Sequence, residues 1–486
     1  YILDQLNGSA YSASHRLFGL SITSGQATLT SQTDQFTDAM VGRTIRVDQA
    51  GSGGGVLSTT ISAYTNARSV TLADNAASTV SLKGVGRIRG TDVSEAFDAW
   101  MADLGTRRVR GVMPGGTFNL SGNHEIPDDA WIEGSGHTNT ILMLVNGVSA
   151  DTDVLRTNGF AGYDGNTGTT NGNRAARGFG LTRFMIDGDF RSNANGRFGL
   201  AAYAFDWYMR EVLILGCKDS ALYSACNMTS GNTPHQLGTG PGGIHTYLHR
   251  IMVGNSADSG RQMQFLGPHD SYVQGLDIYK DGSYSTDGLY IGHTGVGSGV
   301  DGGGGSQFSD IHAWGNHEVG VNVASGGTLI DNLQSEGGNL QLRIAGAKIK
   351  VNHARLYGVT GTGADEGLEM ASGSDNMLTG LKIEDCDVAA VRFSGGGANS
   401  FIEGVASSDN GTAPPLIVGT VPATCSVQLL GVGGYDRSIR KVGGHAVVAG
   451  DFGTFSSTWG TTPSIAVAPG SNVYRGNATV TAGGAT

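Results

Sequence analysis

Apolar and polar residues alternate in short segments between Leu276 and Ser394, and most segments end at a turn residue. One pair of segments occurs five times in this stretch: an apolar-x-apolar-x run, then, after a few polar residues, a second apolar-x-apolar run that usually follows a glycine. The first pair spans 276–280 and 288–292, and the last spans 381–385 and 391–394. Because side chains along a strand alternate between two faces, each segment predicts a short strand with one apolar face.

The second run of each pair repeats at intervals that are typical of a solenoid. Its apolar anchors are Leu289, Val321, Leu342, Leu368, Val391 and Leu416. Most intervals are 21 to 26 residues, and the first is 32 because it holds a Gly-rich stretch near 294–305. Coils of this length predict a parallel β-solenoid with three sheets, in which insertions lie at the turns. Two further insertions are expected, as long loops over 137–180 and 225–244.

The remaining sequence divides around this solenoid. Residues 1–19 show no period and are expected to form an arm or linker, whereas 20–85 contain short alternating runs that predict a small β module. The solenoid, with a helix over 92–104 that covers its first coil, is assigned to 86–430. Residues 431–486 lose the coil pattern, which predicts a C-terminal β cap or an oligomerisation module.

The predicted helix has one apolar face. That face consists of Val93, Ala96, Phe97, Trp100 and Leu104. Asp92 is expected to cap the helix, with Glu95 as its partner in a capping box. An amphipathic helix laid across the open end of a solenoid would cover its exposed core and backbone.

Composition narrows the function classes. The net charge of −11 disfavours nucleic acid as a partner, since such binding needs a basic face, and it also disfavours a membrane surface. No apolar run approaches the ~18 residues of a membrane span. The four cysteines show no CxxC spacing and are expected to be small buried residues, with a Cys217–Cys226 bridge as the open alternative.

Residues at the x positions of the first runs are expected to face outward and to stack in two columns, ~4.8 Å apart from coil to coil. The first column is Met185, Leu213, Met252, Asp277, His312, Gln334, Arg355 and Lys382. The second column is Asp187, Leu215, Gly254, Tyr279, Trp314, Glu336, Tyr357 and Glu384. Both change from mainly apolar to polar and aromatic at Asp277. The early apolar patch is expected to be covered by loops or by another subunit.

Two acids in the polar part of these columns are candidates for catalysis. Asp277 and Glu336 lie two coils apart, about 9 to 10 Å between backbones, and their side chains can close this to the ~6.5–9.5 Å of inverting hydrolases. His312 lies on the coil between them and is the third candidate. The alternative is a solvated polar face or a subunit interface, since every solenoid has polar outward columns.

Aromatic and polar residues around these acids suit a sugar polymer, because aromatic rings offer flat faces to pyranose rings and polar groups offer hydrogen bonds. The candidate substrate-binding residues are Tyr279, Trp314, Gln334, Arg355, Tyr357, Asp281 and Asp287. Asp281 and Asp287 belong to the turn beside the patch and are candidate substitute acids. No metal ligand is assigned.

Three features of the first coils carry a family resemblance. They are the helix motif Asp92-x-x-x-Ala96-Phe97, the strand Pro114-x-Gly116-x-Phe118 and the strand Ile132-x-Gly134-x-Gly136. With them, residues 90–430 resemble the pectate-lyase-like superfamily of right-handed parallel β-helices, of the tailspike or depolymerase type. The resemblance implies an all-β fold. It does not fix the reaction, because the superfamily holds polysaccharide lyases, glycoside hydrolases, epimerases and tailspike depolymerases.

The resemblance and the polar columns together predict an extracellular protein that binds and depolymerises a bacterial surface or extracellular polysaccharide, by acid/base glycoside hydrolysis without a cofactor. One alternative is a polysaccharide lyase acting on a uronic-acid polymer, which would use calcium, with Asp277 and Asp281 as ligands and Arg355 as base. The other is a non-catalytic glycan-binding spike or adhesin.

Residues 20–85 resemble a module that precedes β-helices in phage tail proteins and some bacterial surface proteins. This resemblance, with the apolar column, predicts a homotrimer on a virion tail, or a secreted or cell-surface protein. It also implies other phage tail proteins as partners of the N-terminal region.

Overall fold

The computed structural model of the chain contains two compact units. It describes residues 15–88, 92–145, 148–149, 151–157, 160, 176–188, 197–225, 245–256, 260–268, 270–292, 305–358, 365–408, 415–432 and 445–449. Unit 1 comprises 1–158, 178–201 and 210–218, and unit 2 comprises 159–177, 202–209 and 219–486. The predicted arm lies almost entirely outside the described residues, as do most of the predicted loop over 225–244 and the glycine-rich stretch near 294–305.

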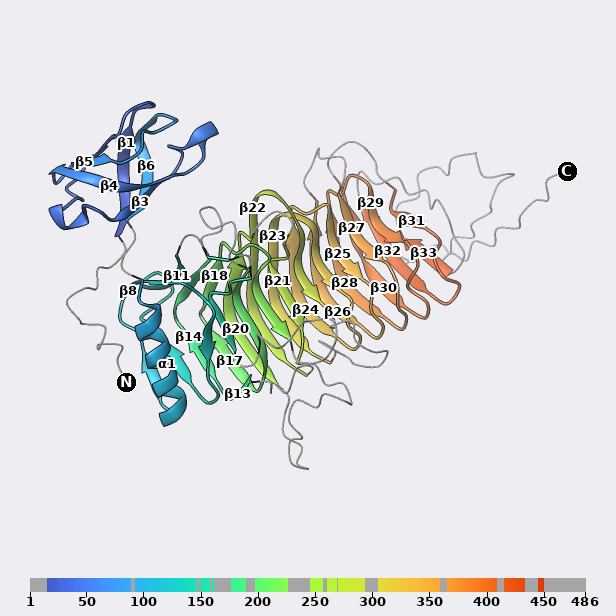
Figure 1. Ribbon diagram of the computed structural model, residues 1–486. Coiled ribbons are helices and arrows are strands. Elements are labelled where there is room, and N and C mark those ends of the chain that lie inside the picture. The colour runs from blue at the N-terminus through green and yellow to red at the C-terminus, as the bar shows by residue number, and fades with distance from the viewer. Residues whose placement is uncertain are drawn as a thin grey trace. The chain divides into compact units, whose positions relative to one another are not determined.

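The predicted β module is a closed antiparallel barrel in unit 1, with strand order β1-β2-β5-β4-β3-β6 (Figure 1). Its strands are β1 (His15–Ile22), β2 (Thr28–Ser31), β3 (Thr44–Val47), β4 (Leu57–Asn66), β5 (Ser69–Leu72) and β6 (Val80–Ile88). Two short 3-10 turns, η2 (Asp38–Met40) and η3 (Ser52–Gly54), lie between strands. Every second residue of β2 and β3 is buried, so the alternation that predicted these strands marks the residues that fill the barrel.

Helix α1 (Ser94–Arg107) corresponds to the predicted helix. The predicted capping box is wrong: the N-cap residue is Val93, which makes no side-chain cap, and Asp92 instead accepts a hydrogen bond from the Ser94 N–H at 2.9 Å. At the other end, Arg108 adopts a left-handed conformation with φ 53° and ends the helix.

The buried side of α1 packs on the first strand of the first coil. Phe97, Trp100 and Leu104 are buried as predicted, whereas Ala96 is exposed. A Cβ atom added at Gly111 would lie 2.3 Å from Trp100 and 2.5 Å from Leu104. Only a glycine at this position therefore lets the helix approach so closely.

Each coil contains up to three strands, which we call A, B and C in chain order. In unit 1 the A strands are β7 (Arg110–Val112), β10 (Trp131–Glu133) and β14 (Gly180–Thr182). The B strands are β8 (Gly116–Leu120), β11 (Thr140–Leu144), β15 (Met185–Asp187) and β18 (Leu213–Leu215). The C strands are β9 (His124–Ile126), β12 (Leu155–Thr157) and the first half of β16 (Phe198–Phe205). Strands of one letter pair in parallel with those of the neighbouring coils.

In unit 2 the A and B strands of a coil form one continuous strand. These are β20 (Thr246–Gly254), β22 (Tyr272–Ile291), β23 (Gln307–Val323), β24 (Leu329–Glu336), β26 (Lys350–Tyr357), β28 (Met377–Glu384), β30 (Phe401–Ser407) and β32 (Ser426–Val432). The C strands are β19 (Ser220–Ala225), β21 (Met263–Leu266), the ends of β22 and β23, β25 (Leu340–Ile344), β27 (Glu366–Met370), β29 (Ala389–Phe393) and β31 (Ile417–Gly419). Strand β13 (Ala176–Arg177) pairs with the second half of β16, and β17 (Trp207–Arg210) contributes residues to both units.

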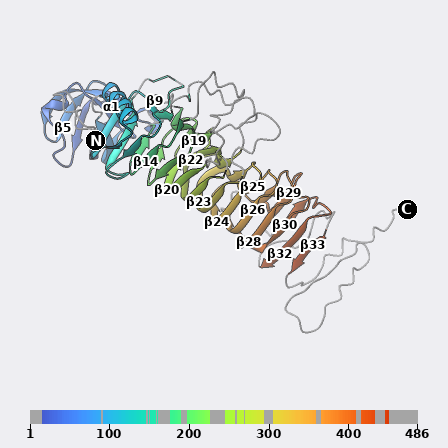
Figure 2. The same cartoon turned by 90° about the horizontal axis from the view of Figure 1, so that it is seen from below.

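Successive coils of unit 2 stack in parallel, as Figure 2 shows for β20 to β33, so the predicted parallel β-solenoid is confirmed. The C anchors pair in the predicted order from Leu289 to Val391. The last anchor is one residue off, because Val391 pairs with Ile417 and not with Leu416.

A single residue in the left-handed conformation separates the A and B parts of most continuous strands. In successive coils these residues are Arg250, Gly275, Asp310, Asn332, His353 and Gly380, with φ between 51° and 69°. Gly, Asn and Asp adopt this conformation most readily, and they fill four of the six positions. The bend turns the chain from one sheet to the next without a loop.

Two boundary predictions are corrected by the structure. The predicted loop over 137–180 contains β11 and β12, which pair with the coils on either side, and 161–175 lie outside the described residues. The solenoid also continues past residue 430, because β33 (His445–Ala449) pairs in parallel with β32. A C-terminal cap stays a prediction, since 450–486 lie outside the described residues.

The helix contact gives a stability prediction. Replacing Phe97, which is fully buried, with alanine should lower the free energy of unfolding by about 3–5 kcal/mol, because a large cavity forms under α1. Thr106→Ala, at an exposed position of the same helix, should change it by less than about 0.5 kcal/mol. Guanidinium unfolding of the three proteins checks this, and equal losses in both variants would contradict the packing described.

Candidate functional site

The two predicted outward columns exist in unit 2, in the predicted register. Asp277, His312, Gln334, Arg355 and Lys382 are paired on successive B strands. The second column pairs Tyr279, Trp314, Glu336, Tyr357 and Glu384 on the same strands. The residues that alternate with them within each strand, such as Ile278, Ala313 and Leu356, point into the solenoid and are buried. Strand alternation therefore placed all ten side chains on one face.

His312 lies between the two candidate acids. Its Nε2 is 3.0 Å from Glu336 Oε1, and its Nδ1 is 3.4 Å from Asp277 Oδ1. Gln334 Nε2 donates a hydrogen bond of 3.3 Å to the other Glu336 oxygen. Because one imidazole ring joins them, the two carboxyl oxygens are no more than about 9 Å apart, which is below the ~9.5 Å upper limit of inverting glycosidases. The structure thus brings together all three predicted catalytic residues.

Aromatic rings lie directly beside these acids. The ring centroids of Tyr279 and Trp314 are 4.6 Å apart, and Trp314 also stacks on His312 at 6.0 Å with an interplanar angle of 23°. The Tyr279 hydroxyl accepts a hydrogen bond of 3.0 Å from Asn255. These rings remain half-buried, so part of their surface is open to a ligand.

Arg355 is held by an acid of the next coil. Its Nε donates to Glu384 Oε2 at 2.6 Å, and its guanidinium carbon lies 5.4 Å from the Tyr357 ring centroid. Hydrogen bonding to Glu384 raises the pKa of Arg355 above its ordinary value, which disfavours a role as a base. Burial favours the neutral form of Glu384, but hydrogen bonds from Lys382 and Arg355 outweigh it and lower the pKa of this carboxyl.

The two acids assigned to the neighbouring turn separate in the structure. Asp281 is exposed, and its backbone N–H donates to Asn255 at 3.1 Å. The Asp287 side chain is buried and accepts hydrogen bonds from Arg261 at 2.7 Å and Asn322 at 3.2 Å. Burial raises the pKa of Asp287. Both of its partners belong to the C-strand side of the coils, so the structure gives Asp287 no bond to the candidate acids of the B strands.

His317 supports the site from inside and was not found from the sequence. Its Nε2 donates to the Trp314 carbonyl oxygen at 3.1 Å, and its Nδ1 lies 2.8 Å from the Ser285 hydroxyl, which donates to it. Burial lowers the pKa of His317 to about 4. A lone histidine after a turn carries no sequence signal for this role, because its partners come from a neighbouring coil and from the backbone.

Other predictions concern residues outside the polar columns. Met185, Leu213 and Leu215 in unit 1, and Met252 in unit 2, are half-buried. Cys217, Cys386 and Cys425 are buried as expected, and Cys226 lies outside the described residues. In the described part of the chain, no helix is long and apolar enough to cross a membrane, and no three His, Cys, Asp or Glu residues group as metal ligands.

Comparison with known proteins finds similarity in solved structures alone. No protein-family model matches the chain, and no curated protein matches it. The chain is similar to the mannuronan C-5 epimerase AlgE4 A-module of Azotobacter vinelandii, with 13% identity and a TM-score of 0.42 over 74% of this chain and 96% of that one. It is also similar to the Dettilon tailspike protein, with 12% identity and a TM-score of 0.47 over 74% and 65% of the two chains.

A third similar structure is the catalytic domain of a GH87 α-1,3-glucanase, with 9% identity and a TM-score of 0.42 over 92% of this chain and 98% of that one. Epimerases, glycoside hydrolases and tailspikes are among the classes that the sequence resemblance named. Likeness at so low an identity does not identify the reaction of this chain.

The buried His317 predicts a pH dependence of stability. Its folded pKa of about 4 lies below the ~6.5 of an unfolded histidine, so the unfolded chain binds the extra proton first. The contribution of the neutral His317 side chain to the free energy of unfolding is complete above about pH 6.5. It falls by up to about 3 kcal/mol as the pH is lowered towards 4. The difference in free energy of unfolding between wild type and His317→Gln should therefore shrink as the pH falls from 7 to 4. His353→Gln, at an exposed position of unit 2, should leave the wild-type pH profile unchanged.

Proposed function

We propose that the chain binds a polysaccharide along the polar B-strand columns and cleaves it by acid/base glycoside hydrolysis. The observation that carries this proposal is the position of His312, which contacts both Asp277 and Glu336 and limits their separation to about 9 Å, below the upper limit for inversion. The His312 ring occupies the space between the two carboxyl groups, so the proposal requires this ring to move aside when a sugar and the attacking water enter.

The hydrogen bonds favour different roles for the two acids. Glu336 accepts a bond from the Gln334 amide, which holds its carboxylate in place to take a proton from water as the general base. Asp277 is the more exposed acid, with 55% of its side chain accessible. In this proposal Asp277 is the general acid, which protonates the leaving oxygen of the bound sugar.

The aromatic residues supply the binding surface in this proposal. Tyr279 and Trp314 present adjoining ring faces beside the acids, and such faces stack on the apolar sides of pyranose rings. Gln334 and Tyr357 lie on the same face, on the next two coils, so a linear polymer could follow the columns. Depolymerisation of a bacterial surface or extracellular glycan by a trimeric, extracellular or virion-tail protein remains part of this proposal.

In this proposal, the protonated state of Arg355 favours hydrolysis over elimination. A lyase needs a base that can lose its proton, and the ion pair with Glu384 keeps the Arg355 guanidinium protonated. A non-catalytic glycan-binding spike is the second candidate. It is favoured by the His312 ring, which stands between the two acids where the attacking water would be needed.

The acid pair gives a direct test of catalysis. Asp277→Asn and Glu336→Gln should each lower the release of reducing ends from a cleaved glycan by at least about 100-fold, because each removes a proton-transfer group. Binding of the intact polymer should persist. Asp331→Asn, at an exposed position on the same strand as Glu336, is the matched control and should keep full activity.

A screen of acidic and neutral bacterial glycans, with reducing-end and ultraviolet readouts, identifies the substrate. Full activity in both acid variants would show that the site is wrong. Binding without any shortening of the polymer would leave the non-catalytic spike. Products that absorb as unsaturated uronic acids would establish a lyase.

The aromatic surface gives a separate test of binding. Trp314→Ala should weaken polymer binding by about tenfold, or about 1.4 kcal/mol, because the stacking face beside Tyr279 is lost. Tyr272→Ala removes an exposed aromatic ring from an A strand and should leave affinity unchanged. Affinity electrophoresis in gels containing the polymer measures both, and an equal loss in the two variants would contradict binding along the B strands.

A further inference from the structure

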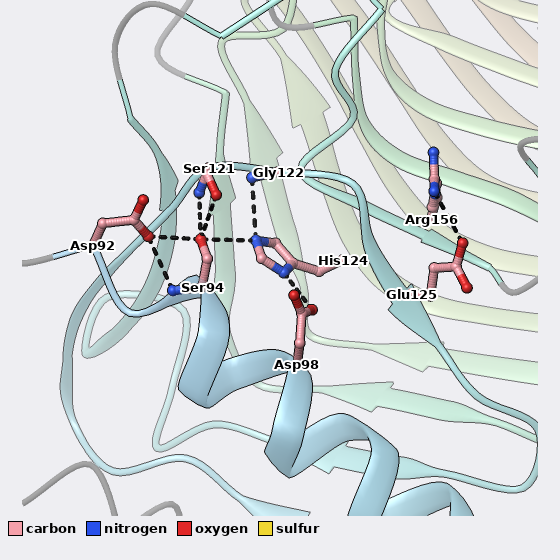
Figure 3. Close-up of polar contacts among 8 residues, drawn as sticks. All are labelled: Asp92, Ser94, Asp98, Ser121, Gly122, His124, Glu125 and Arg156. Atoms are coloured by element: carbon pink, nitrogen blue, oxygen red, sulfur yellow. Dashed lines mark hydrogen bonds and ion pairs between the residues drawn. The ribbon is translucent and has the colours of Figure 1, made fainter.

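A serine, a histidine and an aspartate meet where helix α1 lies against β9 in unit 1. Ser94 Oγ is 3.3 Å from His124 Nε2, and His124 Nδ1 is 2.6 Å from Asp98 Oδ1 (Figure 3). Ser94 and Asp98 are one turn apart on the helix, and His124 is the first residue of β9. The ring of His124 is buried against Phe97, at 5.3 Å and nearly perpendicular to it.

The protonation of the histidine follows from its neighbours. The Gly122 backbone N–H donates to His124 Nε2 at 3.1 Å, and a backbone amide can only donate. Nε2 is therefore the unprotonated nitrogen, and Nδ1 carries the proton that it donates to Asp98. This is the tautomer that a general base needs, with its proton held by a carboxylate, and its Nε2 lone pair accepts from the Gly122 N–H while lying 3.3 Å from Ser94 Oγ.

The serine occupies the first position of a 14-residue helix, where the helix dipole is positive. The first N–H groups of a helix have no partner within it. Here the Ser94 N–H donates to Asp92 and the Phe97 N–H donates to Val93. Among the described residues, the N–H groups of Glu95 and Ala96 donate to no acceptor. They are donors available to an oxyanion beside Ser94.

We propose that Ser94, His124 and Asp98 form a second catalytic centre, which hydrolyses small acyl esters such as the O-acetyl groups of a sugar. Ser94 is half-buried and His124 is buried, which suits a small acyl group. The proposal stands apart from the proposed glycan cleavage, since none of its residues belongs to the B-strand columns.

The reaction needs only water as co-reactant. Ser94 Oγ attacks the ester carbonyl carbon while its proton passes to His124 Nε2, and Asp98 stabilises the resulting imidazolium. The C–O bond to the alcohol then breaks, and the alcohol leaves with the proton from His124. Water, deprotonated by His124, attacks the acyl-serine and releases the carboxylic acid, which restores the Ser94 hydroxyl.

A role in helix capping accounts for only part of the cluster. Asp92 Oδ1 accepts from the Ser94 hydroxyl at 2.6 Å, and the Ser121 N–H and hydroxyl both donate to Ser94 Oγ, at 2.6 and 2.7 Å. These contacts fasten the start of α1. They do not require a bond between the buried His124 ring and Asp98, whose side chain is 56% exposed. Asp92 is the competing acceptor for the serine proton, and the experiment must separate it from His124.

A fluorophosphonate probe tests the centre, because it phosphonylates an activated serine. Wild-type protein should be labelled at Ser94, as located by peptide mass spectrometry, and Ser94→Ala should remove the label. Asp98→Asn should slow labelling at least tenfold without changing thermal unfolding, since Asp98 is exposed. Thr106→Ala, which removes a hydroxyl from the other end of α1, should label at the wild-type rate. Asp92→Ala should retain labelling, because His124 remains the base.

Hydrolysis of p-nitrophenyl acetate provides the second readout. Turnover should fall at least tenfold in Ser94→Ala and persist in Asp277→Asn, so a failure of glycan cleavage would leave this result intact. An unlabelled Ser94 in folded wild-type protein overturns the proposal. A wild-type labelling rate in Asp98→Asn, or lost labelling in Asp92→Ala with unchanged thermal unfolding, also overturns it, because His124 would then not be the working base.

Discussion

In-register parallel hydrogen bonding between successive coils is the constraint on which the rest of this structure depends. Each backbone pairing places an outward side chain directly over its counterpart one coil away, about 4.8 Å along the stack. Side chains far apart in sequence, such as Asp277 and His312, therefore become neighbours. The same pairing directs the alternate residues inward, where they form a continuous apolar core.

The short spacing between coils also determines which charged side chains can lie next to each other. Like charges on adjacent strands repel, whereas opposite charges stabilise the pair. The structure accordingly joins Arg343 to Glu369 at 2.6 Å and Arg355 to Glu384 at 2.6 Å, each across neighbouring coils. Against this pattern of paired charges, His312 differs because it touches two acids from two coils.

The two candidate centres have different structural origins. The site on the B strands arises from repetition, since the same two positions of successive coils supply every residue. The Ser94 cluster lies at the first coil of the solenoid. There α1 packs against the coil and places its side chains Ser94 and Asp98 beside His124. Gly111 makes this docking close, since any larger residue would collide with Trp100 and Leu104. Activity at either centre remains proposed.

The sequence by itself determined the solenoid and the membership of both outward columns, because a period of two assigns each residue of a strand to a face without knowledge of distant contacts. The tertiary structure decided the rest. The A strands carry no boundary signal, since one left-handed residue such as Asp310 or Asn332 replaces a loop. The bonds of Asp287 to Arg261 and Asn322, and the meeting of Ser94 with His124, join segments whose approach depends on how coils and helix pack. Local pattern fixes the direction of a side chain, and only packing fixes its partner.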